Sequence, residues 1–420
     1  DPTHVINILR ELAYKMHFEK RNNIKIDEVG QVIEVYKQEY RQKVNIRTFL
    51  ETVLRAKILI ESDDELRFKD HTVVAYFVAQ ALNQKYNQGE DIENNLELLL
   101  KNLCFSINSD IILFLALITN NPKFINIIAE GARKHFEDQE ELSFDRKNLM
   151  YILDTKLPVK DSFPDKEERK QREKDISKQE ETIKLNEIIE LVNEYDYTEK
   201  DLEKIENQVM ISLKYIEVLS KSLPAFCQNM KVEQQDKLVD LIYRCPNKFL
   251  FSVLIEIGED FEGYCNELHH EITALRKEKN ADEISVNSVR KALEQMSSIF
   301  IVMLYQLVAS TCANEQSILA LNEFDYQNST NYSLQNLMMA ARIDDVNLFS
   351  QKAKKLDKQV DNNLSKTIIK YTVRDYFLRN NNVELYGEAQ SLMDQFFKNS
   401  ASQEIRMNMA RKRMINKNRT

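Results

Sequence analysis

The fold is decided by one stretch, Ile58-Leu-Ile-Glu-Ser-Asp-Asp-Glu-Leu-Arg-Phe68. Its first residues are β-like, and the residues from Glu65 to Phe68 alternate between polar and apolar side chains, as a half-buried strand does. Between these halves lies Ser62-Asp-Asp64, which consists of residue types that favour turns. The stretch therefore predicts a β-hairpin, and no other part of the sequence gives as strong a hairpin signal.

Helices are predicted on both sides of this hairpin. Amphipathic patterns cover Val5–Lys20, the residues from Asp27 to about Tyr40, a segment that starts at Asn45, and the residues from His71 to about Tyr86. Asp27 and Asn45 are suitable N-caps for their helices. A short extended piece at 24–26 separates the first two helices. Helix, short strand, helix, helix and a two-stranded wing is the order of a winged helix. Its predicted core comprises Leu12, Met16, Val32, Ile33, Leu50, Leu54, Leu59 and Phe68.

Glycine is scarce in the whole chain, and this scarcity predicts a helical protein. The 420 residues include 6 Gly and 6 Pro, against about 7% and about 5% in typical proteins. Tight turns need glycine, because only glycine reaches positive φ without steric cost. We expect an all-α protein, in which a winged-helix domain with a small β-hairpin is followed by a multi-helix bundle or a helical-repeat array.

Composition and proline positions divide the chain into segments. We expect a winged-helix domain at 1–90, a helical domain at 91–156, a charged linker at 157–185, a helical sensor or repeat domain at 186–400, and a basic tail at 401–420. Within the last helical domain, breaks are predicted near Pro224, Cys245-Pro246, Asn280 and Phe324–Ser333. The tail is either a frayed terminus or a contact for nucleic acid or an acidic partner.

Two stretches of the helical region resemble each other, Asn120–Gly131 and Arg244–Gly258. Both place Pro and Phe ahead of an apolar helix that ends near a Glu and a Gly. Stacked helical-pair repeats would produce this similarity, and so would chance resemblance between two amphipathic helices. Both interpretations stay open at the level of the sequence.

Charge and cysteine usage restrict the environment of the protein. The net charge of −9 argues against a general attraction to nucleic acid or to anionic membranes. The 5 cysteines are scattered, which indicates reduced thiols in a cytoplasmic protein. The longest apolar run, Ile299–Ala309, is about half as long as a membrane span requires, so we predict a buried bundle helix there.

The sequence lacks two common catalytic motifs, the phosphate loop and the serine-hydrolase elbow. A phosphate loop needs Gly, then four residues, then Gly-Lys-Ser/Thr. Gly258 and Gly263 have this spacing, but Tyr264 and Cys265 follow them. No G-x-S-x-G elbow occurs either. We therefore expect no catalytic residue in this chain and no enzyme activity from it alone.

Cys265, His269 and His270 are candidate ligands of a zinc ion. Cys and His four residues apart on a helix can share a metal ion. A structural zinc site needs four ligands, however, and Cys245 is the only other nearby candidate. A surface His beside a buried Cys is the ordinary interpretation, so no metal site is predicted.

The run from Ile58 to Leu82 resembles the end of the winged-helix domain of NACHT-type STAND proteins, which are signal-transducing P-loop ATPases. The shared pattern is a wing strand ending in Phe, a His shortly afterwards, and a helix containing aromatic-aromatic-x-Ala. The matching residues are Phe68, His71, Tyr76, Phe77 and Ala79. The resemblance covers about the first 90 residues. Asp70 before His71, and Ala75 where the family often has Glu, depart from the pattern.

The resemblance implies a regulatory role for this chain. In such proteins an upstream core binds ATP or ADP with Mg, and a winged-helix His contacts the phosphates of ADP and keeps the protein closed. By position, His71 would be that residue and the cofactor-binding one here; Tyr76, Phe77 and Leu82 would be core. The helical region would bind a sensed ligand or protein partner, and activation would bring homo-oligomerisation. The ATPase core would precede Asp1, and the resemblance would make the full-length protein a bacterial defence protein.

A second function stays open, in which the chain is a non-enzymatic helical scaffold or regulator. Its winged helix would then bind DNA or a protein partner. Winged helices often bind DNA through their third helix, which here carries Arg47, Arg55 and Lys57, with Glu51 among them. Because the net charge is acidic, we expect protein partners rather than nucleic acid, and no membrane.

Overall fold

The structure is a computed structural model in which helices dominate, as the sequence predicts. It describes residues 2–62, 64–119, 121–144, 149–157, 159, 167–168, 171, 174, 204–278, 282, 284–324, 329–343, 345–380 and 388–397. The chain forms two compact units, Asp1–His135 with Ser177–Val218 and Phe136–Ile176 with Leu219–Thr420. Most of the predicted linker at 157–185, the following residues to 203, and the whole basic tail at 401–420 lie outside the described residues.

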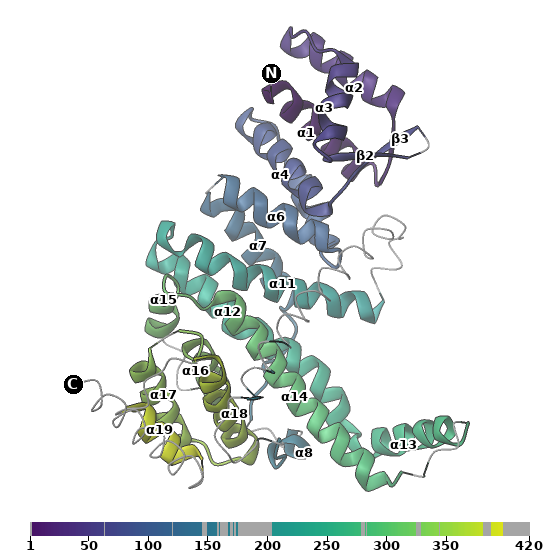
Figure 1. The fold of residues 1–420 in the computed structure, drawn as a ribbon. Helices are drawn as coiled ribbons and strands as arrows, with labels where there is room; N and C mark the ends of the chain where they lie inside the picture. Colours follow the sequence, from purple (N-terminus) through teal and green to yellow (C-terminus); the bar gives the residue numbers. More distant parts are fainter. Residues whose placement is uncertain are drawn as a thin grey trace, which may run out of the picture. The chain divides into compact units, whose positions relative to one another are not determined.

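The first unit opens with a winged helix. Its elements are α1 (Pro2–Phe18), β1 (Ile24–Lys25), α2 (Ile26–Tyr40), α3 (Ile46–Arg55), β2 (Leu59–Ser62), β3 (Glu65–Phe68) and α4 (His71–Asn87). Figure 1 shows these elements in purple, with the β2–β3 wing at the side of the helices. Both the order of elements and the hairpin confirm the predicted winged-helix fold.

The wing belongs to a three-stranded antiparallel sheet of order β1-β3-β2. Leu59 faces Phe68 and Ser62 faces Glu65, so the hairpin is closed by a two-residue connection. Asp64 in this connection has φ of 61°, a left-handed conformation that Asp tolerates better than most residues. β1 adds to the free side of β3 through Ile24 and Lys25.

The core of the winged helix differs in part from the predicted one. Leu12, Met16, Ile33, Leu59 and Phe68 are buried, as predicted. The prediction was wrong for the remaining residues, Val32, Leu50 and Leu54, which are only half-buried. Besides Ile33, the buried positions on α2 and α3 are Val29, Tyr36, Phe49 and Val53. Each apolar stripe is wide enough for either set, and packing against α1 and the sheet chooses between neighbouring positions.

The two predicted N-caps have different outcomes. The Asn45 side chain accepts hydrogen bonds from the backbone N–H groups of Arg47 and Thr48, so the predicted cap of α3 is confirmed. The prediction for Asp27 was wrong, because α2 already begins at Ile26 and Lys25 occupies its N-cap position. Asp27 lies in the first turn, where a carboxylate still interacts favourably with the helix dipole.

Helices continue the first unit beyond the winged helix. They are α5 (Glu93–Lys101), α6 (Ser106–Thr119), α7 (Pro122–His135) and the first part of α11 (Ile205–Phe226). α4 packs against both α1 and α6. Gly131 lies inside α7, where a Cβ atom would stand 2.9 Å from the Tyr215 hydroxyl of α11. Gly131 therefore permits a close approach of two helices. The sequence comparison with Arg244–Gly258 placed Gly131 near the end of its helix, but α7 continues past it to His135.

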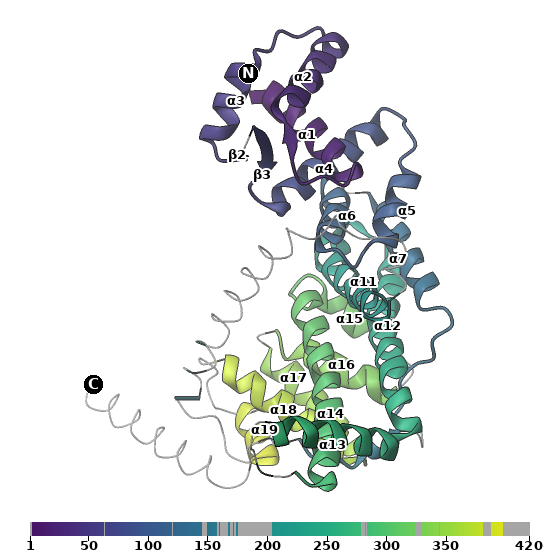
Figure 2. The same ribbon diagram turned by 90° about the vertical axis from the view of Figure 1, so that its right-hand side faces the viewer.

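All regular elements among the described residues of the second unit are helices. Besides the end of α11 it contains α8 (Met150–Leu153), η2 (Cys227–Asn229), α12 (Val232–Glu259), α13 (Phe261–Glu278), α14 (Val286–Cys312), α15 (Ile318–Glu323), α16 (Thr330–Ala340), α17 (Val346–Gln359), α18 (Asn363–Arg379) and α19 (Glu388–Phe396). α14 packs against α12, α13 and α16, and α16 also packs against α17 and α18. Figure 2 shows the helices from α12 to α19 in teal, green and yellow.

The helix break predicted at Cys245-Pro246 was wrong. α12 runs through Pro246 without interruption, whereas α11 ends at Phe226, shortly after Pro224. Proline inside a helix removes one backbone hydrogen bond, a loss that surrounding polar groups can offset. Next to Pro246, the Asn247 side chain donates to the Tyr243 carbonyl at 2.9 Å. The two similar stretches therefore differ in structure, since Pro122 starts its helix and Pro246 lies within one.

The apolar run in α14 has two different faces. Ile301, Tyr305 and Val308 are fully buried, in agreement with the predicted bundle helix. Met296 and Met303 are 64% and 62% exposed, and this second face was not predicted. Among the described residues α14 is the one helix whose length and composition would suit a membrane crossing, and 44% of its most apolar window is buried in the unit.

Candidate functional site

His71, the predicted site residue, is the first residue of α4. The residue before it is the N-cap Asp70, whose side chain accepts a hydrogen bond from the Thr72 backbone N–H at 2.8 Å. Asp70 therefore has a local structural role that explains an acidic residue at this position. The cap fixes the start of α4 and with it the direction in which His71 leaves the helix.

His71 is buried, with 6% of the residue exposed. Its Nε2 atom lies 3.6 Å from the Asp110 Oδ2 atom of α6. The attraction between them depends on protonation of the imidazole, since a neutral ring carries no charge. Asp110 is more accessible, because 27% of its side chain is exposed. The structure thus gives His71 a carboxylate neighbour inside the first unit.

A second buried histidine, His17 of α1, also contacts α6. His17 is 7% exposed, and burial lowers its pKa from 6.5 to about 4, while a hydrogen bond with Asn108 opposes part of this shift. Its imidazole is therefore neutral at pH 7. Sequence analysis missed His17, because it stands at the edge of an amphipathic stripe and no motif marks it. Two residues of α6, Asn108 and Asp110, thus contact histidines from two different helices.

The aromatic pair of the family pattern is split between the core and the surface. Phe77 is buried with its ring centroid 6.2 Å from that of Phe68, and Leu82 is fully buried, as predicted. Tyr76 is 40% exposed, so its prediction as a core residue was wrong. Adjacent helix residues point about 100° apart, so one of the pair faces outward. Tyr76 stands edge-on to Phe114 of α6 at 5.8 Å.

The surroundings of His71 suit a phosphate in some respects only. An imidazole at the start of a long helix is a suitable donor for an anion, because the helix dipole is positive there. The carboxylates of Asp70 and Asp110 oppose an anion at the same place. One imidazole beside two carboxylates does not make a nucleotide site, and the described residues of this chain form no complete one.

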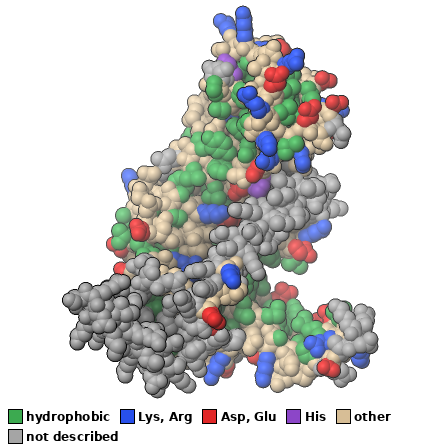
Figure 3. Space-filling view, in the orientation of Figure 1, with side chains coloured by type: hydrophobic (Ala, Val, Ile, Leu, Met, Phe, Trp, Pro, Cys, Tyr) green, Lys and Arg blue, Asp and Glu red, His purple; other side chains and the backbone are tan. Residues whose placement is uncertain are grey.

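The third helix and the wing give little support for DNA binding. Arg47 is highly exposed, and its guanidinium is paired with Glu51 at 3.1 Å. The wing carries Glu61, Asp64 and Glu65, and acidic side chains are visible at this end of the unit in Figure 3. A phosphate backbone would meet repulsion from such a wing. In the scaffold alternative, these charges favour a protein partner over DNA.

The structure does not bring the candidate zinc ligands Cys265 and His269 together around a common point. Cys265 is fully buried, whereas the His269 Nε2 atom lies 2.8 Å from the Ile284 carbonyl oxygen. No group of three His, Cys, Asp or Glu side chains suited to a metal ion occurs among the residues that the structure describes. The cysteines in this part of the chain are free thiols, and burial raises the pKa of Cys245 to about 12.

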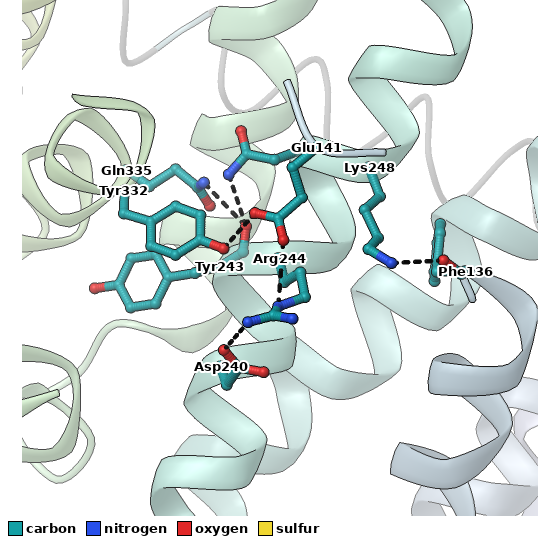
Figure 4. Close-up of polar contacts among 9 residues, drawn as sticks. Phe136, Glu141, Asp240, Tyr243, Arg244, Lys248, Tyr332 and Gln335 are labelled. Atoms are coloured by element: carbon teal, nitrogen blue, oxygen red, sulfur yellow. Dashed lines mark hydrogen bonds and ion pairs between the residues drawn. The ribbon is translucent and has the colours of Figure 1, made fainter. Parts of the chain in front are cut away.

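A partly buried polar cluster in the second unit was not predicted. Glu141 accepts a hydrogen bond from the Tyr332 hydroxyl at 2.5 Å and lies 3.4 Å from the Arg244 guanidinium, as Figure 4 shows. Gln335 donates to the Tyr243 carbonyl at 3.2 Å in the same view. Burial and the neighbouring Glu141 raise the pKa of Tyr332 well above its usual value. The cluster joins the segment after α7 to α12 and α16, and these links between separate parts of the second unit indicate a structural role.

Comparison with known proteins gives one result. A family model described as "Novel STAND NTPase 4" matches residues 22–78. This range covers the three strands, α2, α3 and the first part of α4, and it includes His71. No curated protein and no solved structure matches the chain. The match relates the winged-helix region to STAND-type NTPases.

Proposed function

We propose that this chain is the regulatory and ligand-sensing part of a STAND-type signalling ATPase of the NACHT kind, whose ATPase core precedes it in the full-length protein. The match over residues 22–78 carries the proposal, because it names an NTPase and falls on the winged helix that contains His71. The 420-residue sequence has no phosphate loop, so the nucleotide core of such an ATPase would belong to another segment.

In this proposal His71 reports the presence of the nucleotide. When the winged helix adjoins the core, the imidazole N–H donates a hydrogen bond to a phosphate oxygen. When the winged helix moves away, the imidazole keeps Asp110 as its anionic neighbour, at the 3.6 Å separation described above. The Asp110 carboxylate and the phosphate then compete for the His71 imidazole. Asp110 thereby weakens the closed state, so that less free energy is needed to separate the winged helix from the core.

The helical region would supply the sensing function. We place a sensed ligand or protein partner on the helices of the second unit, whose movement would be passed to the winged helix. Release of the closed state would then allow nucleotide exchange and homo-oligomerisation. We also propose a cytoplasmic location, in agreement with free cysteines among the described residues.

Nucleotide retention by the full-length protein tests the proposal. Nucleotide released by denaturation is quantified by chromatography for the parent and for His71→Ala, Asp110→Asn and His270→Ala. His270 is exposed on α13 and serves as the matched control. We expect ADP in the parent, loss of ADP in His71→Ala, equal or greater retention in Asp110→Asn, and no change in His270→Ala.

Two results would contradict the proposal at different levels. Unchanged ADP and unchanged signalling in His71→Ala would refute the sensing role of this histidine. A gene whose upstream part encodes neither a phosphate loop nor a Walker B acidic strand would refute the ATPase itself.

A further inference from the structure

A polar pocket of about 370 Å³ lies in the first unit, away from His71. It is formed by α1, α4 and α6, and its lining residues are Arg10, Gln80, Asn83, Gln84, Asn87, Gln88 and Ile118. The carboxamides follow one face of α4 and its C-cap, with spacings of three and four residues. The lining thus combines one cation with a row of amide groups, and these described residues include no carboxylate.

Two buried atoms in this lining have opposite hydrogen-bonding character. Arg10 Nε is a donor and Gln84 Oε1 is an acceptor, and neither has a hydrogen-bond partner among the described residues. The other ends of both side chains are held in place. Arg10 Nη2 donates to Asn7 Oδ1 at 3.0 Å, and Gln84 Nε2 donates to the Tyr40 hydroxyl at 2.8 Å. The lining residues of the pocket therefore include one buried donor and one buried acceptor whose hydrogen bonds are not made within the described residues.

We propose that this pocket binds an extended peptide segment that carries an acidic side chain. A peptide unit offers both an N–H and a carbonyl group, and carboxamides can satisfy both. The row from Gln80 to Gln88 spans about 12 Å along the helix, which corresponds to about three to four residues of an extended chain. The Arg10 guanidinium would receive the acidic side chain through its Nε–H. This inference does not depend on the proposed relation to an ATPase.

Other ligand classes fit the lining less well. A free phosphate or carboxylate only accepts hydrogen bonds, so it would leave the Gln84 acceptor without a partner. Single-stranded nucleic acid is held by several cations and by aromatic side chains on which bases stack, and the lining described above has one cation and no aromatic ring.

Fluorescence anisotropy with the whole chain tests the proposal. The probes are a fluorescein-labelled alanine hexapeptide amide with glutamate at its third position and a twin with glutamine there. We expect saturable binding of both peptides, tighter for the glutamate peptide. Arg10→Gln is expected to weaken the glutamate peptide at least about tenfold and to leave the glutamine peptide nearly unchanged. Arg10→Lys should restore only part of this affinity, because lysine lacks the planar fork.

Matched variants separate recognition from folding. Gln84→Leu should weaken both peptides, whereas Gln31→Leu and Arg47→Gln, which change exposed residues of α2 and α3, should weaken neither. The comparison of two peptides on one variant remains informative even if that variant is less stable.

Three results would overturn the proposal. The first is no saturable binding of the glutamate peptide up to about 1 mM. The second is equal binding by the parent, Arg10→Gln and Gln84→Leu. The third is displacement by free glutamate at the concentration at which the unlabelled peptide displaces, which would assign the pocket to a small carboxylate.

Discussion

Acidification is expected to weaken the first unit, because His17 is buried there in its neutral form. The pKa of His17 falls from 6.5 to about 4 on folding, mainly through burial. Between these two pH values the unfolded chain binds a proton at His17 that the folded chain does not. The unfolded state is then favoured, so stability is lost as the pH falls from 6.5 to about 4. Above pH 6.5 the titration of His17 adds no pH dependence to the free energy of unfolding.

The size of the effect follows from the same pKa difference. A shift of about 2.5 pH units corresponds to ~3 kcal/mol of unfolding free energy. Carboxylates elsewhere in the chain also titrate in this range, so the parent must be compared with a variant. His17→Gln keeps a polar side chain of similar reach and removes the titration. His270→Gln, on an exposed position of α13, is the matched control.

Hydrogen exchange measured by mass spectrometry is the suitable assay. The peptide that covers α1 reports the local opening free energy near His17, after correction for the intrinsic exchange rate at each pH. We expect the opening free energy of α1 to fall between pH 7 and pH 4 by ~3 kcal/mol more in the parent and in His270→Gln than in His17→Gln. The same pH dependence in all these proteins would refute the buried neutral state of His17.

Further predictions concern packing and buried hydrogen bonds. Gly131→Ala is expected to destabilise the protein by about 1–3 kcal/mol in thermal melts, since its Cβ would stand 2.9 Å from the Tyr215 hydroxyl. Gly30→Ala, whose Cβ would meet only a flexible side-chain end at 3.3 Å, is the control and should change stability by less than about 1 kcal/mol; equal effects would contradict the packing argument. Asn247→Leu is expected to cost about 1–3 kcal/mol in urea unfolding, because the buried Tyr305 hydroxyl loses its acceptor at 2.6 Å. An unchanged urea midpoint would show that this bond contributes nothing.

Local sequence signals predicted the winged helix well. The Ile58–Phe68 hairpin, the Asn45 cap and the order of the elements all depend on residues close together in the chain. Signals that depend on distant partners were less informative. Tyr76 was predicted to be a core residue, but the packing of α4 leaves it 40% exposed, with its ring edge-on to Phe114 of α6. Pro246 was predicted to break a helix, but α12 continues through it, and the Asn247 side chain donates to the Tyr243 carbonyl.

The candidate sites show the same limit. The position of His71 at the start of α4 was predictable from the sequence, whereas its neighbour Asp110 was not, because α6 follows much later in the chain. The amide row on α4 is visible in the sequence as recurring Asn and Gln at helical spacing. The sequence did not indicate that Arg10 of α1 lines the same pocket as these amides, and the proposed peptide site depends on this arrangement.

The edges of the small sheet affect the tendency of this protein to aggregate. A sheet edge offers unpaired backbone groups on which a strand from another molecule can add. β3 is paired on both sides, so the edges are β1, with 2 residues, and β2, with 4 residues. β2 ends with the exposed Glu61 and Ser62. Such short edges, each with an exposed charged residue (Lys25 on β1 and Glu61 on β2), are poor templates for aggregation, and we expect self-association to use helical faces instead.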